Sequence, residues 1–234
     1  MNIIITGASS GVGFEAVLEL ILTGDHKVVA LARSEDKLGR LLEIAQGLNP
    51  DCILYPVAFD IVHDDYADLI QFISVRLDNR VDILINNAGV LINKPFTDLL
   101  ETDFVEMLQS NFIGHVRITQ SLLPLIPAGG HILNIGSMGG FHGSVKFPGL
   151  SAYSASKAAL HTLTECLAQE LTDKQIKVNC LALGSAQTEM LEKAFPGYES
   201  PLLAFEMGKY IADFALTGHK FYNGKILPVA VTTP

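Results

Sequence analysis

Short runs of apolar residues alternate along this chain with longer stretches in which apolar positions recur every three or four residues. The short runs are rich in Val, Ile and Leu and predict β-strands, whereas the longer stretches predict amphipathic helices. Nearly continuous apolar content is typical of parallel strands that are covered on both faces. Seven strands are expected, at residues 2–6, 27–32, 52–58, 81–86, 130–136, 176–182 and 225–231.

This alternation of strands and helices predicts the fold class. We expect an α/β protein with a Rossmann-type doubly wound parallel sheet of about seven strands and helices on both faces. The 234 residues are 49% hydrophobic and suffice for one large core, so residues 1–234 are expected to form a single domain. Two stretches rich in Gly and Pro, 139–149 and 196–201, predict loops and are candidate lids.

The first predicted strand leads into a glycine-rich turn, in the sequence MNIIITGASSGVG. The apolar run ends at Thr6, glycines follow as Gly7, Gly11 and Gly13, and an amphipathic stretch continues to Leu22. Glycine lets the backbone approach a ligand closely, and the free N–H groups at a helix start attract phosphate. The spacing G-x-x-x-G-x-G differs from the standard G-x-G-x-x-G, so a dinucleotide site is predicted from the mechanism, with an ordinary glycine-rich turn as the alternative.

The second predicted strand, KVVALAR, ends where such folds distinguish their cofactors. Ala32 and Arg33 stand there, and no acidic residue lies between Lys27 and Ser34. A carboxylate would bind the ribose 2′-OH of NAD, whereas an arginine fork suits the 2′-phosphate of NADP. The sequence therefore predicts that NADP(H) is preferred over NAD(H), with a surface arginine as the alternative.

Tyr153 and Lys157 lie four residues apart in the segment YSASK, and on a helix they share one face. The ordinary pKa of tyrosine, about 10, makes it a poor acid or base near neutral pH. A neighbouring ammonium lowers that pKa, and proton transfer works best when the pKa lies near the working pH. The pair is a candidate for proton transfer, although the same spacing also occurs by accident on exposed helices.

Taken together, these segments resemble the short-chain dehydrogenase/reductase family, in its shorter single-domain branch. The matching segments are TGASSGVG, AFDI with Asp60, the NNAG motif, NFIG with Asn111, NIGS with Ser137, and YSASK. The resemblance runs from residue 3 to about residue 190, and the motifs occur in the order that the family shows.

The resemblance implies a role for each matching residue. Asn111, Ser137, Tyr153 and Lys157 are the implied catalytic residues. Ser137 would polarise a substrate carbonyl, Tyr153 would transfer the proton, Lys157 would hold the nicotinamide ribose and lower the Tyr153 pKa, and Asn111 would hold a water. The implied cofactor-binding residues are Gly7, Ser9, Ser10, Gly11, Val12, Gly13, Arg33, Asp60 at the adenine, Asn87, Ala88, Gly89, Tyr153, Lys157, Gly184 and Thr188 at the nicotinamide.

Two departures from the family pattern are present. Leu183-Gly184 replaces the Pro-Gly pair that usually follows the sixth strand, so this loop is expected to sit differently. Sixteen positions separate Ser137 from Tyr153, a few more than usual, and the added length lies beside the expected site. We therefore expect an altered substrate choice.

The function expected from these observations is NADP(H)-dependent hydride transfer between a nicotinamide cofactor and a carbonyl or secondary alcohol, with Tyr153 as general acid and base. A non-catalytic dinucleotide-binding sensor or scaffold is the alternative, since a fold alone does not establish catalysis. A sugar-nucleotide epimerase or dehydratase would resemble the longer branch, whose G-x-x-G-x-x-G motif and large carboxyl-terminal region are missing here. Met190, Leu191, Phe195 and Tyr198 suggest a partly apolar substrate pocket and leave the substrate open.

Charge and composition add limits. The net charge of −9 argues against nucleic acid or an anionic membrane as partner. Neither a signal peptide nor an apolar run of about twenty residues is present, so a cytoplasmic protein is expected. The three cysteines lack metal-like spacing and are expected to be reduced core residues.

We expect no metal site, and we expect His115, His131, His142 and His161 to be surface or hydrogen-bonded polar residues. By resemblance, helices at about 103–126 and 154–171 imply a homodimer or homotetramer.

Overall fold

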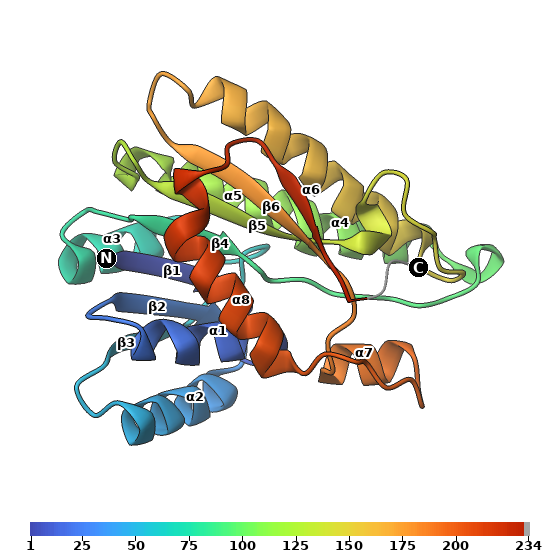
Figure 1. Cartoon of the computed structure of the whole chain (residues 1–234), viewed down its shortest axis with the longest axis horizontal. Helices are drawn as coiled ribbons and strands as arrows, with labels where there is room; N and C mark the ends of the chain where they lie inside the picture. The colour runs from blue at the N-terminus through green and yellow to red at the C-terminus, as the bar shows by residue number, and fades with distance from the viewer. Residues whose placement is uncertain (232–234) are drawn as a thin grey trace.

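All seven expected strands form, and they join one parallel sheet in the order β3-β2-β1-β4-β5-β6-β7 (Figure 1). The structure is a computed structural model and describes residues 1–231. Ile3 of β1 lies opposite Val28 of β2 on one side and Ile83 of β4 on the other. The predicted fold class is confirmed. The strands are β1 Asn2–Thr6, β2 Lys27–Ala32, β3 Ile53–Ala58, β4 Ile83–Asn86, β5 His131–Ser137, β6 Lys177–Leu183 and β7 Ile226–Val229.

The helices cover both faces of this sheet. Their bounds are α1 Gly11–Leu22, α2 Glu35–Leu48, α3 Tyr66–Leu77, α4 Glu101–Leu108, α5 Gly114–Leu122, α6 Ser151–Glu170, α7 Glu189–Ala194 and α8 Ala204–Thr217. The stretch expected as one helix at 103–126 is interrupted by a π-helical turn, Gln109–Ile113, between α4 and α5. Single π-helical turns within α-helices frequently occur at functional sites.

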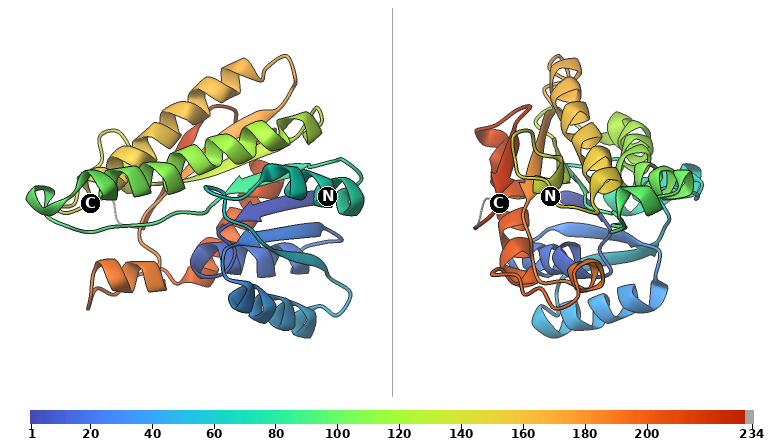
Figure 2. Two further views of the ribbon diagram at one scale, coloured as in Figure 1. Left: turned by 180° about the vertical axis from the view of Figure 1, so that it is seen from behind. Right: turned by 90° about the vertical axis from the view of Figure 1, so that its right-hand side faces the viewer.

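Alternate side chains of the strands from β1 to β6 enter two separate hydrophobic cores. Ile3 and Ile5 pack with α1, α2 and α8 on one face, whereas Ile4 packs with α3, α5 and α6 on the other face. Figure 2 shows these two helical layers from the side and from behind. Each fully buried Ile or Leu contributes about 1.5–3 kcal/mol. A strand buried on both faces therefore needs the continuous apolar sequence from which it was predicted.

The strand order reverses between β1 and its neighbour β4, which are separated in the chain by β2 and β3. Chain segments leaving the two strands diverge to opposite faces at such a point and open a crevice at the carboxyl ends of the strands. The glycine turn after β1, the NNAG segment after β4 and Ser137 at the end of β5 all lie at this edge.

None of the helices within residues 1–231 is long and apolar enough to cross a membrane.

Candidate active site

The glycine turn and the NNAG segment are held together by hydrogen bonds from two side chains. The Thr6 hydroxyl accepts from the backbone N–H groups of Asn87 and Ala88, both at 2.9 Å. The Asn87 side-chain amide donates to the carbonyl oxygens of Thr6 at 2.9 Å and Gly7 at 3.0 Å. These bonds fix the floor of the crevice and bring the predicted positions 87 and 88 against the turn.

Close packing explains two of the glycines. A Cβ atom on Gly7, whose φ is +68°, would lie 2.6 Å from the Ala88 Cα. A Cβ atom on Gly13 would lie 2.2 Å from the Asn87 Nδ2 and 2.6 Å from the Gly7 carbonyl oxygen. Larger residues would therefore separate the two segments.

The start of α1 offers hydrogen-bond donors for phosphate. Ser10 is its N-cap residue, and the Ser10 side chain makes no capping hydrogen bond. The backbone N–H groups at the start of a helix lack partners within the helix and attract anions. Ser9, Gly11 and Val12 lie in the same turn, so the residues fit a dinucleotide pyrophosphate.

Arg33 follows β2 at the other end of this crevice. The Ala32 side chain is buried, whereas Arg33 is exposed and makes no ion pair with another of the described residues. Asp60 lies two residues after β3, and its carboxylate accepts from the Val62 N–H at 2.8 Å. Both predicted positions lie at the carboxyl edge of the sheet, with Arg33 available to an anion.

Tyr153 and Lys157 lie on α6 one turn apart, as predicted. The side chains of Ser137 and Tyr153 both lie beside Gly139, where an added Cβ atom would be 3.5 Å from the Ser137 Oγ and 3.8 Å from the Tyr153 Cδ1. The Lys157 side chain is buried, and its ammonium donates to the Ile135 carbonyl oxygen at 2.8 Å. A Cβ atom on Gly89 would lie 3.5 Å from the Lys157 Nζ. The structure thus brings Ser137, Tyr153 and Lys157 together beside the NNAG segment.

The pKa values differ from the expectation for this group. Burial raises the pKa of Tyr153, and the hydrogen bond from Ser137 opposes that rise. Burial lowers the pKa of Lys157 to about 8. The net shift of the Tyr153 pKa is thus upward, whereas the resemblance implied a downward shift caused by Lys157. The phenol is therefore protonated at neutral pH, as a proton donor has to be.

Asn111 lies in the π-helical turn and is completely buried. Its Oδ1 accepts from the Val90 N–H at 2.8 Å, and its Nδ2 donates to the Val90 carbonyl oxygen at 2.9 Å and to the Ser156 hydroxyl at 3.0 Å. Ser156 in turn donates to the Tyr153 carbonyl oxygen at 2.7 Å. The side chain of Asn111 thus ties the NNAG segment to α6, and both of its N–H donors are engaged by the protein.

Thr188 and Gly184 follow β6. Thr188 is the N-cap of α7 and accepts from the Leu191 N–H at 3.2 Å. Its methyl group would lie 3.2 Å from a Cβ atom on Gly11, which places Thr188 over the glycine turn. Gly184 packs against Ala230, where a Cβ atom would come within 2.7 Å of the Ala230 Cβ. This close approach gives Gly184 a packing role beside its predicted cofactor role.

The sequence interpretation missed a buried polar network under this site. Asn86 donates to Thr119 at 3.1 Å and to Asn134 at 2.8 Å, and Asn134 donates to Thr164 at 2.8 Å. Asn86 and Asn134 lie opposite each other on β4 and β5. An asparagine within an otherwise apolar strand sequence was the signal from which this network could have been predicted. The network joins both strands to α5 and α6 and rigidifies the edge that carries the site.

Some histidine and cysteine predictions need correction. His131 is buried with both ring nitrogens hydrogen-bonded, and His142 is exposed, as expected. His115 and His161 are also buried, but each has one ring nitrogen with no hydrogen-bond partner among residues 1–231. Cys166 is exposed, because it lies on the outer face of α6, so it is not a core residue. Within residues 1–231 no group of three or more potential ligands is arranged for a metal ion.

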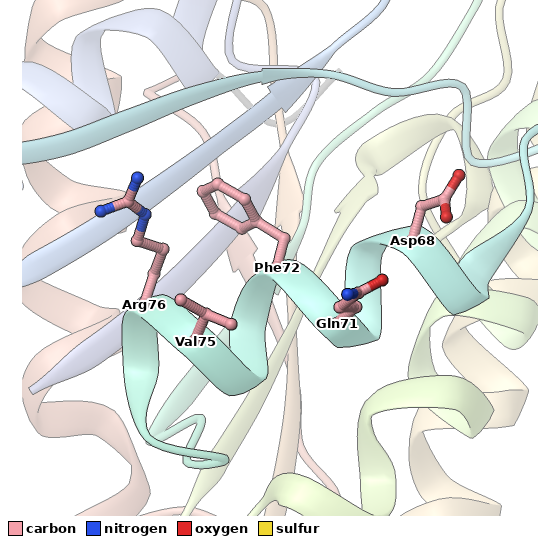
Figure 3. A pocket seen from close by; sticks show the side chains of 5 residues that line it. All are labelled: Asp68, Gln71, Phe72, Val75 and Arg76. Carbon is pink, nitrogen blue, oxygen red and sulfur yellow. The ribbon is translucent and has the colours of Figure 1, made fainter.

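Two of the surface pockets differ in their relation to the predicted site. The first, of about 330 Å³, is lined by Asp68, Gln71, Phe72, Val75 and Arg76, and Figure 3 shows that all five come from α3. None of these residues belongs to the predicted site. The second pocket, of about 790 Å³, is lined by residues that include Phe96, Gly139, Phe147 and Ser154. A Cβ atom on Gly139 would lie 3.5 Å from the Ser137 Oγ, so this second pocket borders the Tyr153 environment.

The parallel sheet, the glycine turn and the neighbouring Tyr153 and Lys157 are the features with which we compared this chain to known proteins. A family model described as short chain dehydrogenase matches residues 1–199. An uncharacterized oxidoreductase of Staphylococcus aureus (strain N315) is 31% identical over 222 residues, which are 94% of this chain and 92% of that protein.

Solved structures agree with these sequence matches. A dehydrogenase/reductase from Sinorhizobium meliloti 1021 matches with a TM-score of 0.84 and 27% identity, covering 97% of this chain and 92% of the other. A short chain dehydrogenase from Shigella flexneri 2a strain 301, complexed with NADP, matches with a TM-score of 0.86 and 26% identity, covering 97% and 95%. The chain therefore belongs to the short-chain dehydrogenase/reductase family and is an NAD(P)-dependent oxidoreductase.

Proposed function

We propose that this enzyme reduces a ketone or aldehyde with NADPH, with Tyr153 as the general acid, and catalyses the reverse oxidation of a secondary alcohol with Tyr153 as base. The observation that carries this proposal is the arrangement of Ser137, Tyr153 and Lys157 at the carboxyl edge of the sheet, next to the glycine turn. The nicotinamide cofactor supplies the hydride when bound.

Ser137 and Tyr153 act on the same substrate oxygen in this proposal. Ser137 and Tyr153 lie side by side next to Gly139, so a carbonyl oxygen bound between the two hydroxyls would receive a hydrogen bond from each. Ser137 stabilises the negative charge that develops on the oxygen, and Tyr153 delivers its phenolic proton to that oxygen. The raised pKa of Tyr153 keeps this proton in place until the charge develops.

Lys157 and Asn111 do not bind the substrate oxygen in this proposal, but they position the cofactor and the surrounding segments. Within residues 1–231 the Lys157 ammonium donates to one acceptor, the Ile135 carbonyl oxygen, and an ammonium has two further protons with which it could bind a ribose hydroxyl. Asn111 holds Val90 and Ser156 and so keeps the NNAG segment at a constant distance from α6. Asn87, Ala88 and Gly89 would form the floor beneath the cofactor.

A preference for NADP(H) over NAD(H) is part of the proposal. The exposed Arg33 guanidinium beside buried Ala32 suits a 2′-phosphate, and residues 27–34 hold no carboxylate to bind a free 2′-hydroxyl. The match to the NADP complex of the Shigella flexneri protein supports the same choice. Asp60 would face the adenine, and Gly184 and Thr188 the nicotinamide end.

Part of the substrate is expected to be apolar. Met190 and Tyr198, which follow the nicotinamide end of the crevice, are 42% and 47% exposed. Large exposed apolar side chains beside a site favour a ligand that covers them. We propose a small-molecule carbonyl or alcohol substrate in a cytoplasmic enzyme that forms a homodimer or homotetramer.

A cofactor-oxidation screen tests the proposal. NADPH and NADH are each offered with panels of ketones, 3-oxoacyl thioesters and quinones, and loss of absorbance of the reduced cofactor is followed. We expect turnover with at least one panel and faster turnover with NADPH. Tight NADPH binding without turnover on any panel would favour the non-catalytic sensor instead.

A further inference from the structure

The side chain of Asn93 joins two segments that are distant in sequence. Asn93 lies four residues after Gly89, on the segment that runs from β4 towards α4. Its Nδ2 donates to the Ala194 carbonyl oxygen at 2.7 Å. Ala194 is the last residue of α7, and carbonyl groups at the end of a helix have no partner within the helix. The Asn93 amide therefore supplies a bond that α7 cannot make for itself.

The other side of the same amide packs against Gly149. A Cβ atom on Gly149 would lie 1.9 Å from the Asn93 Oδ1, and the φ of Gly149 is +85°. The backbone N–H of the next residue, Lys94, donates to the Gly149 carbonyl oxygen at 3.1 Å. Only glycine satisfies both the backbone conformation and this close approach.

Asn93 is held in place from its own segment. The Lys94 ammonium lies 2.8 Å from the Asp103 Oδ1, and the other carboxylate oxygen of Asp103 accepts from the Leu100 N–H at 2.9 Å. The hydrogen bonds of Lys94 and Asp103 thus anchor the backbone next to Asn93 to α4. Figure 2 shows this segment running between α7 and the start of α6.

Both residues that contact the Asn93 side chain, Gly149 and Ala194, lie close in sequence to residues of the proposed site. Gly149 comes two residues before α6 begins, and Tyr153 is in the first turn of that helix. Helix α7 begins after Thr188, which packs over the glycine turn, and it carries Met190 and Leu191. The Asn93 side chain thus connects the start of α6, which carries Tyr153, with α7, which carries the apolar residues expected to line the substrate pocket.

We propose that Asn93 is a positioning residue that sets the separation between α7 and the start of α6, and so fixes where a substrate lies relative to Tyr153. The catalytic part of this inference rests on the proposed carbonyl reduction. Asn93 bonds to the carboxyl end of α7, whereas Thr188 and the glycine turn lie at its amino end, so we expect Asn93 to act on substrate affinity and to leave cofactor affinity unchanged.

Asn49 provides a matched control for the variant Asn93→Ala. The Asn49 Nδ2 also donates to a backbone carbonyl oxygen at 2.7 Å, that of Ile21, but between α1 and the end of α2. The variant Asn49→Ala loses this bond and the one that the Asn49 Oδ1 accepts from the Asp51 N–H at 3.2 Å, and both lie away from α7 and α6.

The first measurement is trypsin cleavage after Lys193 in the cofactor-free protein, followed by mass spectrometry. Cleavage within a folded segment tracks its locally opened population when reclosing is fast. Loss of one hydrogen bond predicts an increase of about three- to tenfold for Asn93→Ala and no change for Asn49→Ala. Equal cleavage rates in Asn93→Ala and the natural protein would overturn the proposal, whatever the enzyme's substrate is.

The second measurement is steady-state kinetics with a substrate found in the screen, together with NADPH binding. For Asn93→Ala we expect KM for the carbonyl substrate to rise about three- to tenfold, with kcat within about twofold and an unchanged dissociation constant for NADPH. A fall in kcat at constant KM, or the same KM change in Asn49→Ala, would contradict a positioning role. If the screen finds no substrate, the proposed reaction fails while the cleavage experiment still decides the role of Asn93 at α7.

Discussion

Replacement of Gly13 by alanine tests whether the glycine turn is built around the Asn87 side chain. The added Cβ would lie 2.2 Å from the Asn87 Nδ2 and 2.6 Å from the Gly7 carbonyl oxygen. Asn87 would have to leave its two hydrogen bonds, at 2.9 and 3.0 Å. Two such bonds contribute about 1–3 kcal/mol, and overpacking against backbone costs about 1–3 kcal/mol more. Alanine stabilises a helix by up to about 1 kcal/mol relative to glycine, which offsets part of this loss.

We therefore expect Gly13→Ala to lower the free energy of unfolding by about 1–5 kcal/mol and to weaken NADPH binding at least tenfold. Urea unfolding followed by circular dichroism and titration of NADPH fluorescence measure the two effects. Gly39 and Gly47 on α2 are matched controls, because a Cβ atom on either meets nothing within 4 Å. Their alanine variants should be as stable as the natural protein or up to about 1 kcal/mol more stable. A Gly13→Ala protein with natural stability and NADPH affinity would refute this account of the turn.

Three further variants test other parts of the site. Lys157→Met removes the buried ammonium and should weaken NADPH binding and lower kcat together; an unchanged dissociation constant with unchanged kcat would remove Lys157 from the mechanism. Ala32→Asp combined with Arg33→Ala should reverse the cofactor preference, because the carboxylate repels the 2′-phosphate, and tighter binding of NADH than NADPH by the natural protein would contradict the role of Arg33. Burial lowers the pKa of His115 to about 3, from an unfolded value near 6.5, so stability is lost as pH falls from about 6.5 towards 3. His115→Gln keeps a donor for the Ala88 carbonyl oxygen but has no group that titrates in this range. Between pH 6.5 and 4.5 its free energy of unfolding should therefore fall by about 2–3 kcal/mol less than that of the natural protein. Equal losses of the two proteins in urea unfolding would show that His115 does not titrate this way.

The sequence predicted the sheet closely because its signal is local. Each strand that is buried on both faces needs a continuous apolar run, and the helix of Tyr153 and Lys157 has the expected spacing. The last strand is shorter than the apolar run at 225–231, and it is an edge strand that contains Pro228. Proline cannot donate to a neighbouring strand, so edge strands tolerate it.

Features that depend on contacts between distant segments were not predictable. The fall in the Lys157 pKa and the rise in the Tyr153 pKa both arise from burial, which a motif does not specify. Ser156 lies within the YSASK segment, but its bonds to Asn111 and to the Tyr153 carbonyl depend on how the π-helical turn packs against α6. Asn93 carries no motif at all, and its partners lie far away in the chain.

The proposed acid–base role of Tyr153 is tested most directly by Tyr153→Phe, which removes one hydroxyl group. General acid catalysis contributes about 10²–10⁴-fold, so kcat should fall by at least two orders of magnitude, with the dissociation constant for NADPH within about twofold of the natural value. Tyr210, exposed on α8, is the control, and Tyr210→Phe should keep full activity. A Tyr153→Phe enzyme that binds NADPH and retains most of its turnover would contradict the assignment of Tyr153 as the proton donor.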